Sequence, residues 1–180
     1  MQVQTKDLGE ETIIRGCIAN DRKEQERLYR TYADEMYNVC LIYESDRDSV
    51  KDILQDAFIK VFKNIGQYNR NGSLRGWIRR IVVNTALDHL RRKNQAGFAV
   101  DIDTVDDELL RSHQNASNLV TKDIIAAVNR LPQGARLVFN LFGLEGYSHK
   151  EIAQMLEITE GTSKSQYSRA RLLLQKWVEM

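Results

Sequence analysis

The segment from Gly72 to Lys93 reads GSLRGWIRRIVVNTALDHLRRK, and its apolar residues recur at intervals of three and four. This spacing predicts one amphipathic helix. Ser73 is the expected N-cap, because its hydroxyl can accept a hydrogen bond from an amide of the first turn. The predicted buried stripe consists of Leu74, Trp77, Ile78, Ile81, Val82 and Thr85.

The same segment concentrates positive charge. From Arg70 to Lys93 the chain has seven lysines and arginines and one acid, although its net charge is only +1. A helix with one buried face and one basic face suits a polyanion such as nucleic acid. The alternative is a solvated helix whose last cations complement its dipole. That alternative does not explain Arg75, Arg79 and Arg80 near the helix start.

Composition favours an all-α fold, because the 180 residues include one proline and ten glycines and are rich in helix-forming residues. The two cysteines, Cys17 and Cys40, cannot make a disulfide framework and fit a reducing cytoplasm. No apolar run approaches the roughly 20 residues of a membrane span, and no secretion signal is visible, so we expect a cytoplasmic chain without membrane insertion.

Catalytic chemistry is not expected. His89, His113 and His149 lie on separate predicted elements without metal-ligand spacing. The sequence has no phosphate-binding loop and no nucleophile motif. We therefore expect no catalytic residues, no metal, no cofactor and no enzymatic activity.

Further helices are predicted before the basic segment, at about residues 11–20, 23–43 and 48–65, with a loop at 66–72. Residues 95–119 then hold five acids, one arginine and few large apolar side chains. This composition predicts a flexible acidic linker; a weakly amphipathic helix at 106–113 is the alternative. We expect two small helical domains, 1–94 and 120–180.

The second domain should begin with a helix that ends near Leu131. Pro132 is expected to be the first residue of the next helix, which runs to about Phe142. Ser148 and Glu151 then form a capping-box pattern, and Thr159 is the expected N-cap of a final helix.

Two short helices separated by a tight turn, with a polar and basic second helix, predict a helix-turn-helix. The second helix is expected to bury Tyr167, Ala170, Leu173 and Leu174, and to expose Thr162, Lys164, Ser165, Gln166, Arg169 and Arg171. An ordinary αα-hairpin is the alternative. Glu157 stands in the turn where glycine is usual, which implies a strained left-handed residue.

Taken together, these motifs resemble the sigma factors of bacterial RNA polymerase, and specifically the small two-domain extracytoplasmic-function (ECF) group of the sigma-70 family. DILQDAFIKVFKNI at 52–65 is similar to the segment that binds the clamp helices of the polymerase β′ subunit. SLRGWIRRIVVNTALDHLRRK is similar to the segment that melts and reads the promoter −10 element, and GTSKSQYSRAR to the helix that reads the −35 element. Lys51 and Gln166 depart from the residues common in the family.

The resemblance implies a protein that binds core RNA polymerase and directs promoter-specific transcription initiation. Residues 1–94 correspond to sigma region 2, residues 95–119 to the linker and residues 120–180 to sigma region 4. The implied partners are the β′ clamp helices and β flap of core polymerase, promoter DNA and an anti-sigma factor.

The resemblance also implies three sets of binding residues. The polymerase-binding residues are Asp52, Gln55 and Asp56. The −10 DNA-binding residues are Tyr68, Asn69, Arg70, Asn71, Ser73, Arg75, Arg79, Arg80, Asn84 and Arg91. The −35 DNA-binding residues are Thr162, Lys164, Ser165, Gln166, Arg169 and Arg171.

Other functions remain open at this stage. A stand-alone helix-turn-helix regulator would normally dimerise and bind a palindromic duplex without polymerase. A sigma-like adaptor would bind polymerase without choosing promoters.

Overall fold

The computed structural model describes residues 3–93 and 126–178, and every regular element in these two ranges is helical. The chain divides into two compact units, Met1–Lys93 and Asn94–Met180. The all-α expectation is therefore confirmed for the described residues. The predicted linker, 95–119, lies outside them. No helix in the described ranges is long and apolar enough to cross a membrane.

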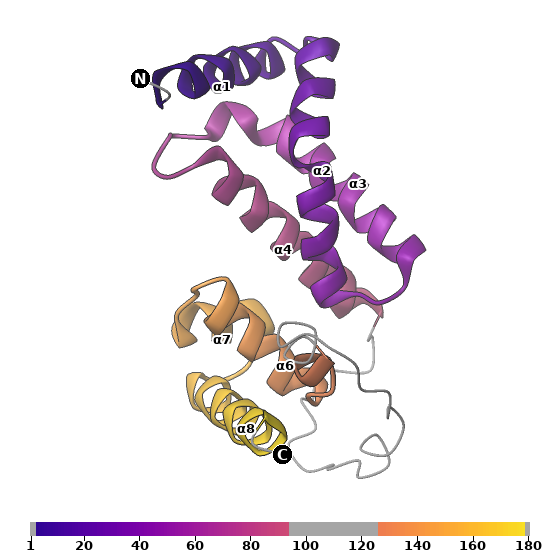
Figure 1. Ribbon diagram of the computed structural model, residues 1–180, viewed down its shortest axis with the longest axis vertical. Helices are drawn as coiled ribbons and strands as arrows, with labels where there is room; N and C mark the ends of the chain where they lie inside the picture. The colour runs from indigo at the N-terminus through magenta and orange to yellow at the C-terminus, as the bar shows by residue number, and fades with distance from the viewer. Residues whose placement is uncertain (1–2, 94–125, 179–180) are drawn as a thin grey trace. The chain divides into compact units, whose positions relative to one another are not determined.

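The first unit consists of α1 (Val3–Ile18), α2 (Arg22–Tyr43), α3 (Arg47–Asn64), a 3-10 turn (Ile65–Gln67) and α4 (Leu74–Lys93). Helices α2, α3 and α4 pack against one another, and α1 lies across the start of α2 and packs against it (Figure 1). Apolar side chains from all four helices fill the space between them. Fully buried examples are Leu28, Met36, Ile53, Val61, Leu74 and Ile78.

The break between α1 and α2 lies where the sequence predicts it. Asn20 has a positive φ of 59°, and the side chain of Asp21 caps α2 by accepting a hydrogen bond from the Lys23 amide at 2.9 Å. Helix α1 begins at Val3, well before the expected residue 11. Helices α1 and α2 approach closely at Gly16. A Cβ at this position would lie only 2.4 Å from Cγ of Glu24, so a larger residue would not fit without a shift.

A larger part of the surface of helix α4 is buried than its sequence pattern predicts. The prediction placed Trp77 and Ile81 in the buried stripe, but both are only partly buried. Val83, Ala86, Leu87 and Leu90 are buried instead, in addition to Ile78 and its neighbours. The reason is that α4 packs against both α2 and α3, so two adjacent sides of the helix face apolar neighbours.

The second unit contains a helical stretch at 126–129, α6 (Gln133–Phe139), a π-helical turn (Asn140–Leu144), α7 (His149–Leu156) and α8 (Glu160–Val178). The sequence suggested that Pro132 is the first helical residue of α6. In the structure Pro132 is the N-cap, and α6 begins at the next residue. The expected helix to Phe142 ends as an α-helix at Phe139 and continues as the π-helical turn. Leu131, Ala135 and Ala170 form one buried cluster, and the partly buried Phe139, Leu173, Leu174 and Trp177 pack against it.

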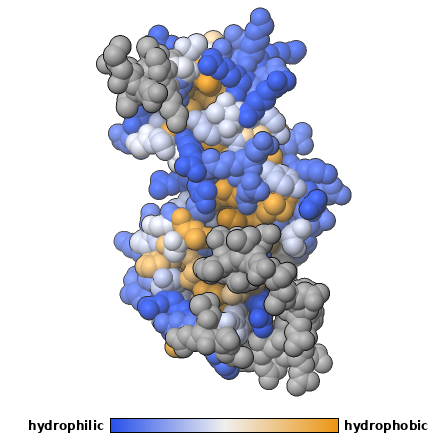
Figure 2. Space-filling view, viewed as in Figure 1, coloured by the Kyte–Doolittle hydropathy of each residue, from blue (hydrophilic) through white to orange (hydrophobic). Residues whose placement is uncertain are grey.

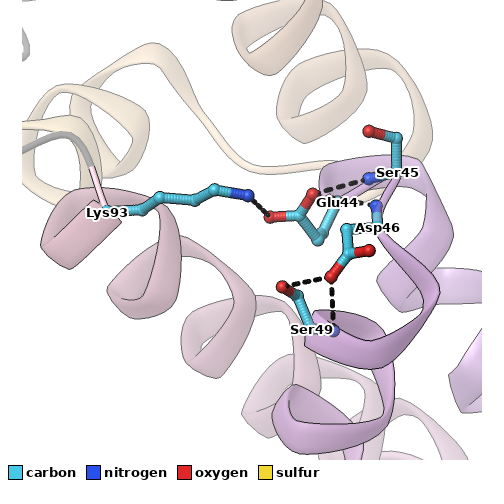
Figure 3. A network of polar contacts seen from close by, with 5 residues as sticks. All are labelled: Glu44, Ser45, Asp46, Ser49 and Lys93. Carbon is cyan, nitrogen blue, oxygen red and sulfur yellow. Dashed lines mark hydrogen bonds and ion pairs between the residues drawn. The ribbon is translucent and has the colours of Figure 1, made fainter.

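A buried carboxylate ties the end of α4 to the turn between α2 and α3 (Figure 3). Glu44 is only 6% exposed, and its Oε1 accepts hydrogen bonds from the amides of Ser45 and Asp46 at 2.9 and 3.0 Å. Its Oε2 accepts one from Nζ of Lys93 at 2.9 Å. Burial alone raises the pKa of Glu44, but these hydrogen bonds and the Lys93 charge outweigh burial, so the pKa lies below its ordinary value.

We therefore expect Glu44→Gln to lower the free energy of unfolding at neutral pH by about 1.5–3 kcal/mol, the usual contribution of hydrogen bonds to a charged group. Because the folded-state pKa lies below the ordinary value of 4.5, this contribution is complete above that pH and is lost as pH falls through the folded pKa. Urea denaturation of both proteins at several pH values measures the difference. Glu26→Gln, at an exposed position on α2, is the control. A difference that stays constant down to acidic pH would contradict this role.

Candidate nucleic-acid interface

The loop before α4 has a defined conformation that exposes amide and guanidinium groups. The Tyr68 hydroxyl donates a hydrogen bond to the carbonyl of Gly72 at 2.7 Å, and its ring lies 5.6 Å from the Trp77 ring. Asn69 Oδ1 accepts a hydrogen bond from the Asn71 amide at 3.1 Å. Gly72 has a φ of 106°, a conformation that side chains beyond glycine rarely adopt. The loop thus presents Asn69 and Asn71 to solvent, with the Tyr68 ring packed behind them against Trp77.

Ser73 caps α4 as predicted. Its Oγ accepts a hydrogen bond from the Gly76 amide at 3.1 Å, and its carbonyl accepts one from the Trp77 amide at 3.1 Å. The cap fixes the point at which the loop turns into the basic helix. Asn71, Ser73 and Arg75 are therefore carried at the exposed start of α4.

The arginines at this end of α4 are paired with acids from other helices, which the sequence did not reveal. Arg75 Nε donates to both carboxylate oxygens of Glu35 on α2, at 2.7 and 2.8 Å. Arg79 Nη1 lies 3.9 Å from the same carboxylate. Arg70, which has a positive φ of 63°, pairs with Glu11 of α1 at 2.6 Å.

These pairs affect proton binding. The hydrogen bond to Glu35 raises the pKa of Arg75. The pKa of Glu11 is lowered, first by its hydrogen bond from Arg15 and then by the charge of Arg70. Both groups are therefore held in their charged forms.

Farther along α4, Arg80 and Asn84 are exposed. Arg91 pairs with Asp88, whose other oxygen lies 3.3 Å from Nζ of Lys60 on α3. The predicted −10 residues thus lie on the loop and on the solvent-facing sides of α4. They form a surface in which positive charge is partly balanced by Glu11, Glu35 and Asp88.

Helix α3 carries the predicted polymerase-binding residues on its outer side. Asp52, Gln55 and Asp56 are exposed, whereas Leu54, Phe58 and Val61 are buried as expected. Ile59 follows on the same side and is 44% exposed. We call these four residues, Asp52, Gln55, Asp56 and Ile59, the α3 strip. The strip combines carboxylates and an amide with an accessible apolar side chain. In the view of Figure 2, the surface around the start of α2 is by contrast mostly hydrophilic.

The second unit contains the helix-turn-helix geometry that the sequence predicts. Ser148 and Glu151 form a complete capping box at the start of α7. Glu157 ends α7 in the left-handed conformation, with φ 57° and ψ 40°. Thr159 then caps α8, because its Oγ1 accepts a hydrogen bond from the Thr162 amide at 3.0 Å.

His149, the first residue of α7, joins α7 to α8. His149 Nδ1 lies 2.9 Å from Oγ of Ser163, which is fully buried. The imidazole stacks on Phe142 with ring centroids 4.4 Å apart, and Phe142 also contacts Tyr167. These contacts fix the start of α7 against α8. The pairing joins residues 14 positions apart, so local periodicity does not disclose it.

The expectation that Gln166 is exposed is wrong. Gln166 is only 4% exposed, and it lies between buried Ser163 and buried Ala170 on the inner side of α8. Helix α8 packs against both α6 and α7, and a polar residue such as Gln166 gives no local sign in the sequence that its side of the helix is covered. Lys164, Ser165 and Arg171 are exposed, and Thr162 and Arg169 are partly exposed. Lys164 pairs with Glu160 at 2.7 Å.

Comparison with protein-family models gives two matches. Residues 28–96 match the model described as Sigma-70 region 2, and residues 121–174 match the model described as Sigma-70, region 4. The first match runs from within α2 to the end of α4, and the second contains the helix-turn-helix. Together they include all three sets of predicted binding residues.

Several curated proteins are similar over most of the chain. The ECF RNA polymerase sigma factor SigM of Mycobacterium tuberculosis is 29% identical over 162 residues, which cover 90% of this chain and 81% of SigM. The ECF RNA polymerase sigma-E factor of Escherichia coli is 25% identical over 178 residues, which cover 93% of each.

Solved structures show the same fold. The sigma factor RpoE from Bartonella quintana, in complex with the anti-sigma factor NepR, has a TM-score of 0.53 and 24% identity over 88% of this chain and 98% of RpoE. CnrH, in complex with the cytosolic domain of CnrY, has a TM-score of 0.52 and 17% identity over 95% of this chain and 97% of CnrH.

The left-handed Glu157 predicts a way to stabilise the helix-turn-helix. A non-glycine residue in this conformation costs roughly 1 kcal/mol, so Glu157→Gly is expected to raise the free energy of unfolding of the second unit by up to about that amount. Glu157→Ala removes the same carboxylate but keeps the strained Cβ, which makes it the matched control. Chemical denaturation followed by circular dichroism compares the two. Equal stability of the glycine and alanine variants would show that the turn stores no such strain.

Proposed function

The chain belongs to the sigma-70 family of RNA polymerase sigma factors, in its ECF group, and we propose that it reads the −10 element with α4 and the preceding loop and the −35 element with α8. As a sigma factor it binds core RNA polymerase and directs promoter-specific transcription initiation. It is a transcription initiation factor and not a classical enzyme. A stand-alone regulator is not favoured, because both sigma regions are present in order.

The observation that carries the −10 assignment is the arrangement around residues 68–75. Exposed amides from Asn69 and Asn71 stand beside Arg70 and Arg75, on a loop whose shape is set by the Tyr68–Gly72 hydrogen bond and the Ser73 cap. Asparagine amides can bond the edge of an unstacked base, and arginines can bind the neighbouring phosphates. Opening a base costs a few kcal/mol, so the loop holds a base that polymerase helps to extrude.

For the −35 element, the burial of α8 limits which side chains can reach a base. Ser165 and Thr162 are short and lie on the accessible side, and partly exposed Arg169 lies one turn beyond Ser165. Lys164 and Arg171 are exposed and suit phosphate contacts. Gln166 is instead buried on the inner side of α8. Base selection at −35 therefore falls to Thr162, Ser165 and Arg169.

The partners follow from the family and from the surface of α3. We infer that Asp52, Gln55 and Asp56 bind the β′ clamp helices of core polymerase and that the second unit approaches the β flap. Two structural neighbours were solved with an anti-sigma factor or a cytosolic partner domain, which supports control of this chain by an anti-sigma factor. We infer a cytoplasmic location, because sigma factors of this family act on RNA polymerase in the cytoplasm.

The polymerase contact predicts a selective binding defect. Asp52→Ala combined with Gln55→Ala should weaken binding to core polymerase, because it removes an exposed charge and an amide without disturbing the buried Leu54, Phe58 and Val61. Pull-down titration against core polymerase measures affinity, with circular dichroism to verify helicity. Glu26→Ala removes an exposed acid from α2 and should bind normally. Unchanged affinity of the double variant would remove this strip from the interface.

The −10 loop predicts a defect in melting that exceeds any defect in initial binding. Asn71→Ala, or Asn69→Ala, should lower open-complex formation by on the order of tenfold and alter −10 preference, since a base-edge contact contributes about 1–3 kcal/mol. Permanganate reactivity of promoter thymines reports melting, and gel shift of the holoenzyme reports binding.

Asn69→Asp separates the two roles of that residue. It keeps the oxygen that accepts from the Asn71 amide but removes the amide donor. Asn38→Ala, at an exposed position on α2, controls for loss of a surface amide. Normal melting and unchanged −10 preference in both Asn69→Ala and Asn71→Ala would exclude the loop from promoter opening.

A further inference from the structure

Two acids reach across from other helices to the arginines that the proposed function assigns to promoter DNA. Glu35 belongs to α2 and Arg75 to α4, 40 residues later; Glu11 belongs to α1 and Arg70 to the loop, 59 residues later. Glu11 Oε1 and Oε2 lie 2.8 and 2.6 Å from Arg70 Nη2. These pairs bring separate helices together at one edge of the proposed −10 surface.

Glu35 engages the edge of Arg75 that bonds oxyanions. Its Oε1 lies 2.7 Å from both Nε and Nη2, and its Oε2 lies 2.8 Å from Nε. A phosphate is recognised by arginine through the same parallel N–H donors. A carboxylate and a phosphate therefore compete for these donors, and the carboxylate is already present in the free chain.

The pairs lie at the surface, so their contribution to folding is small. The Arg70 and Arg75 side chains are each 63% exposed. Exposed ion pairs contribute little to stability because water and salt screen them. For the same reason DNA can displace them, whereas a buried pair would have to be broken at a large cost.

We propose that Glu11 and Glu35 are internal counterions that compete with promoter phosphates for Arg70 and Arg75 and so keep the affinity of the free chain for DNA low. The inference rests on the proposed −10 role of this surface. Within the transcription complex, polymerase holds the promoter next to the arginines and raises the effective concentration of phosphate. The exchange from carboxylate to phosphate then occurs there and not on free DNA.

The test compares neutral variants of the full-length chain. Glu11→Gln and Glu35→Gln remove the competing charge and retain the side-chain size. Glu26→Gln is the matched control, because Glu26 also pairs with an arginine, Arg30 at 2.6 Å. Glu26 lies nine residues before Glu35, which is about two and a half helical turns, and it is therefore on the opposite side of α2. All three substitutions change net charge equally.

Fluorescence anisotropy with a labelled single-stranded oligonucleotide, and with a random duplex, measures affinity across a range of salt concentrations. We expect Glu11→Gln and Glu35→Gln each to tighten binding by about twofold to fivefold relative to Glu26→Gln, in line with the strength of exposed ion pairs. The dependence of affinity on salt should also steepen, since an additional arginine engages phosphate. Affinity equal to that of Glu26→Gln would overturn the proposal. Weaker binding would also overturn it, because the acids would then position the arginines.

Arginine variants distinguish this inference from the proposed function. In an Arg75→Ala background, Glu35→Gln should increase affinity less than it does in the unaltered chain, because only Arg79, 3.9 Å away, then remains beside Glu35. If Arg70→Ala and Arg75→Ala leave promoter binding by the holoenzyme unchanged, these arginines do not contact DNA and both proposals fail. If they weaken holoenzyme binding but the glutamine variants of the free chain match Glu26→Gln, only the counterion proposal fails.

Discussion

The packing of α4 between α2 and α3 is the contact on which the first unit depends. Two adjacent sides of α4 are buried, from Leu74 at its start to Leu90 near its end. The remaining sides must carry the polar residues, and they hold Arg75, Arg80 and Asn84. Because the helix is fixed on two sides, its charged sides have a fixed direction. A binding surface on this helix is therefore rigid before any ligand arrives, which reduces the entropy lost on binding.

The ends of α4 are fixed by polar contacts of two kinds. At its start, the Ser73 cap and the Tyr68–Gly72 hydrogen bond shape the loop. At its end, Lys93 reaches buried Glu44, which also holds the turn between α2 and α3. Stability and function thus use different groups: buried Glu44 supports the fold, whereas the partly exposed Glu11 and Glu35 pair with arginines of the proposed −10 surface.

Local signals in the sequence predicted most of the helices and caps, because capping and apolar spacing depend on residues three or four positions apart. Ser73, Ser148 with Glu151, and Thr159 are examples, and so is the left-handed Glu157. Contacts between distant residues could not be predicted in this way. The Glu35–Arg75 pair and the burial of Gln166 both depend on how helices pack, and a polar residue gives no local sign that its helix neighbour covers it.

The central claim is that α4 and its preceding loop face the −10 element in the transcription complex. Site-specific photo-crosslinking tests it directly, with a photoreactive residue at position 71 or 84 and a control at position 26. The account predicts crosslinks from positions 71 and 84 to promoter DNA around −10, only when core polymerase is present, and none from position 26. Crosslinks confined to position 26, or no DNA crosslinks from either test position in an active complex, would contradict it.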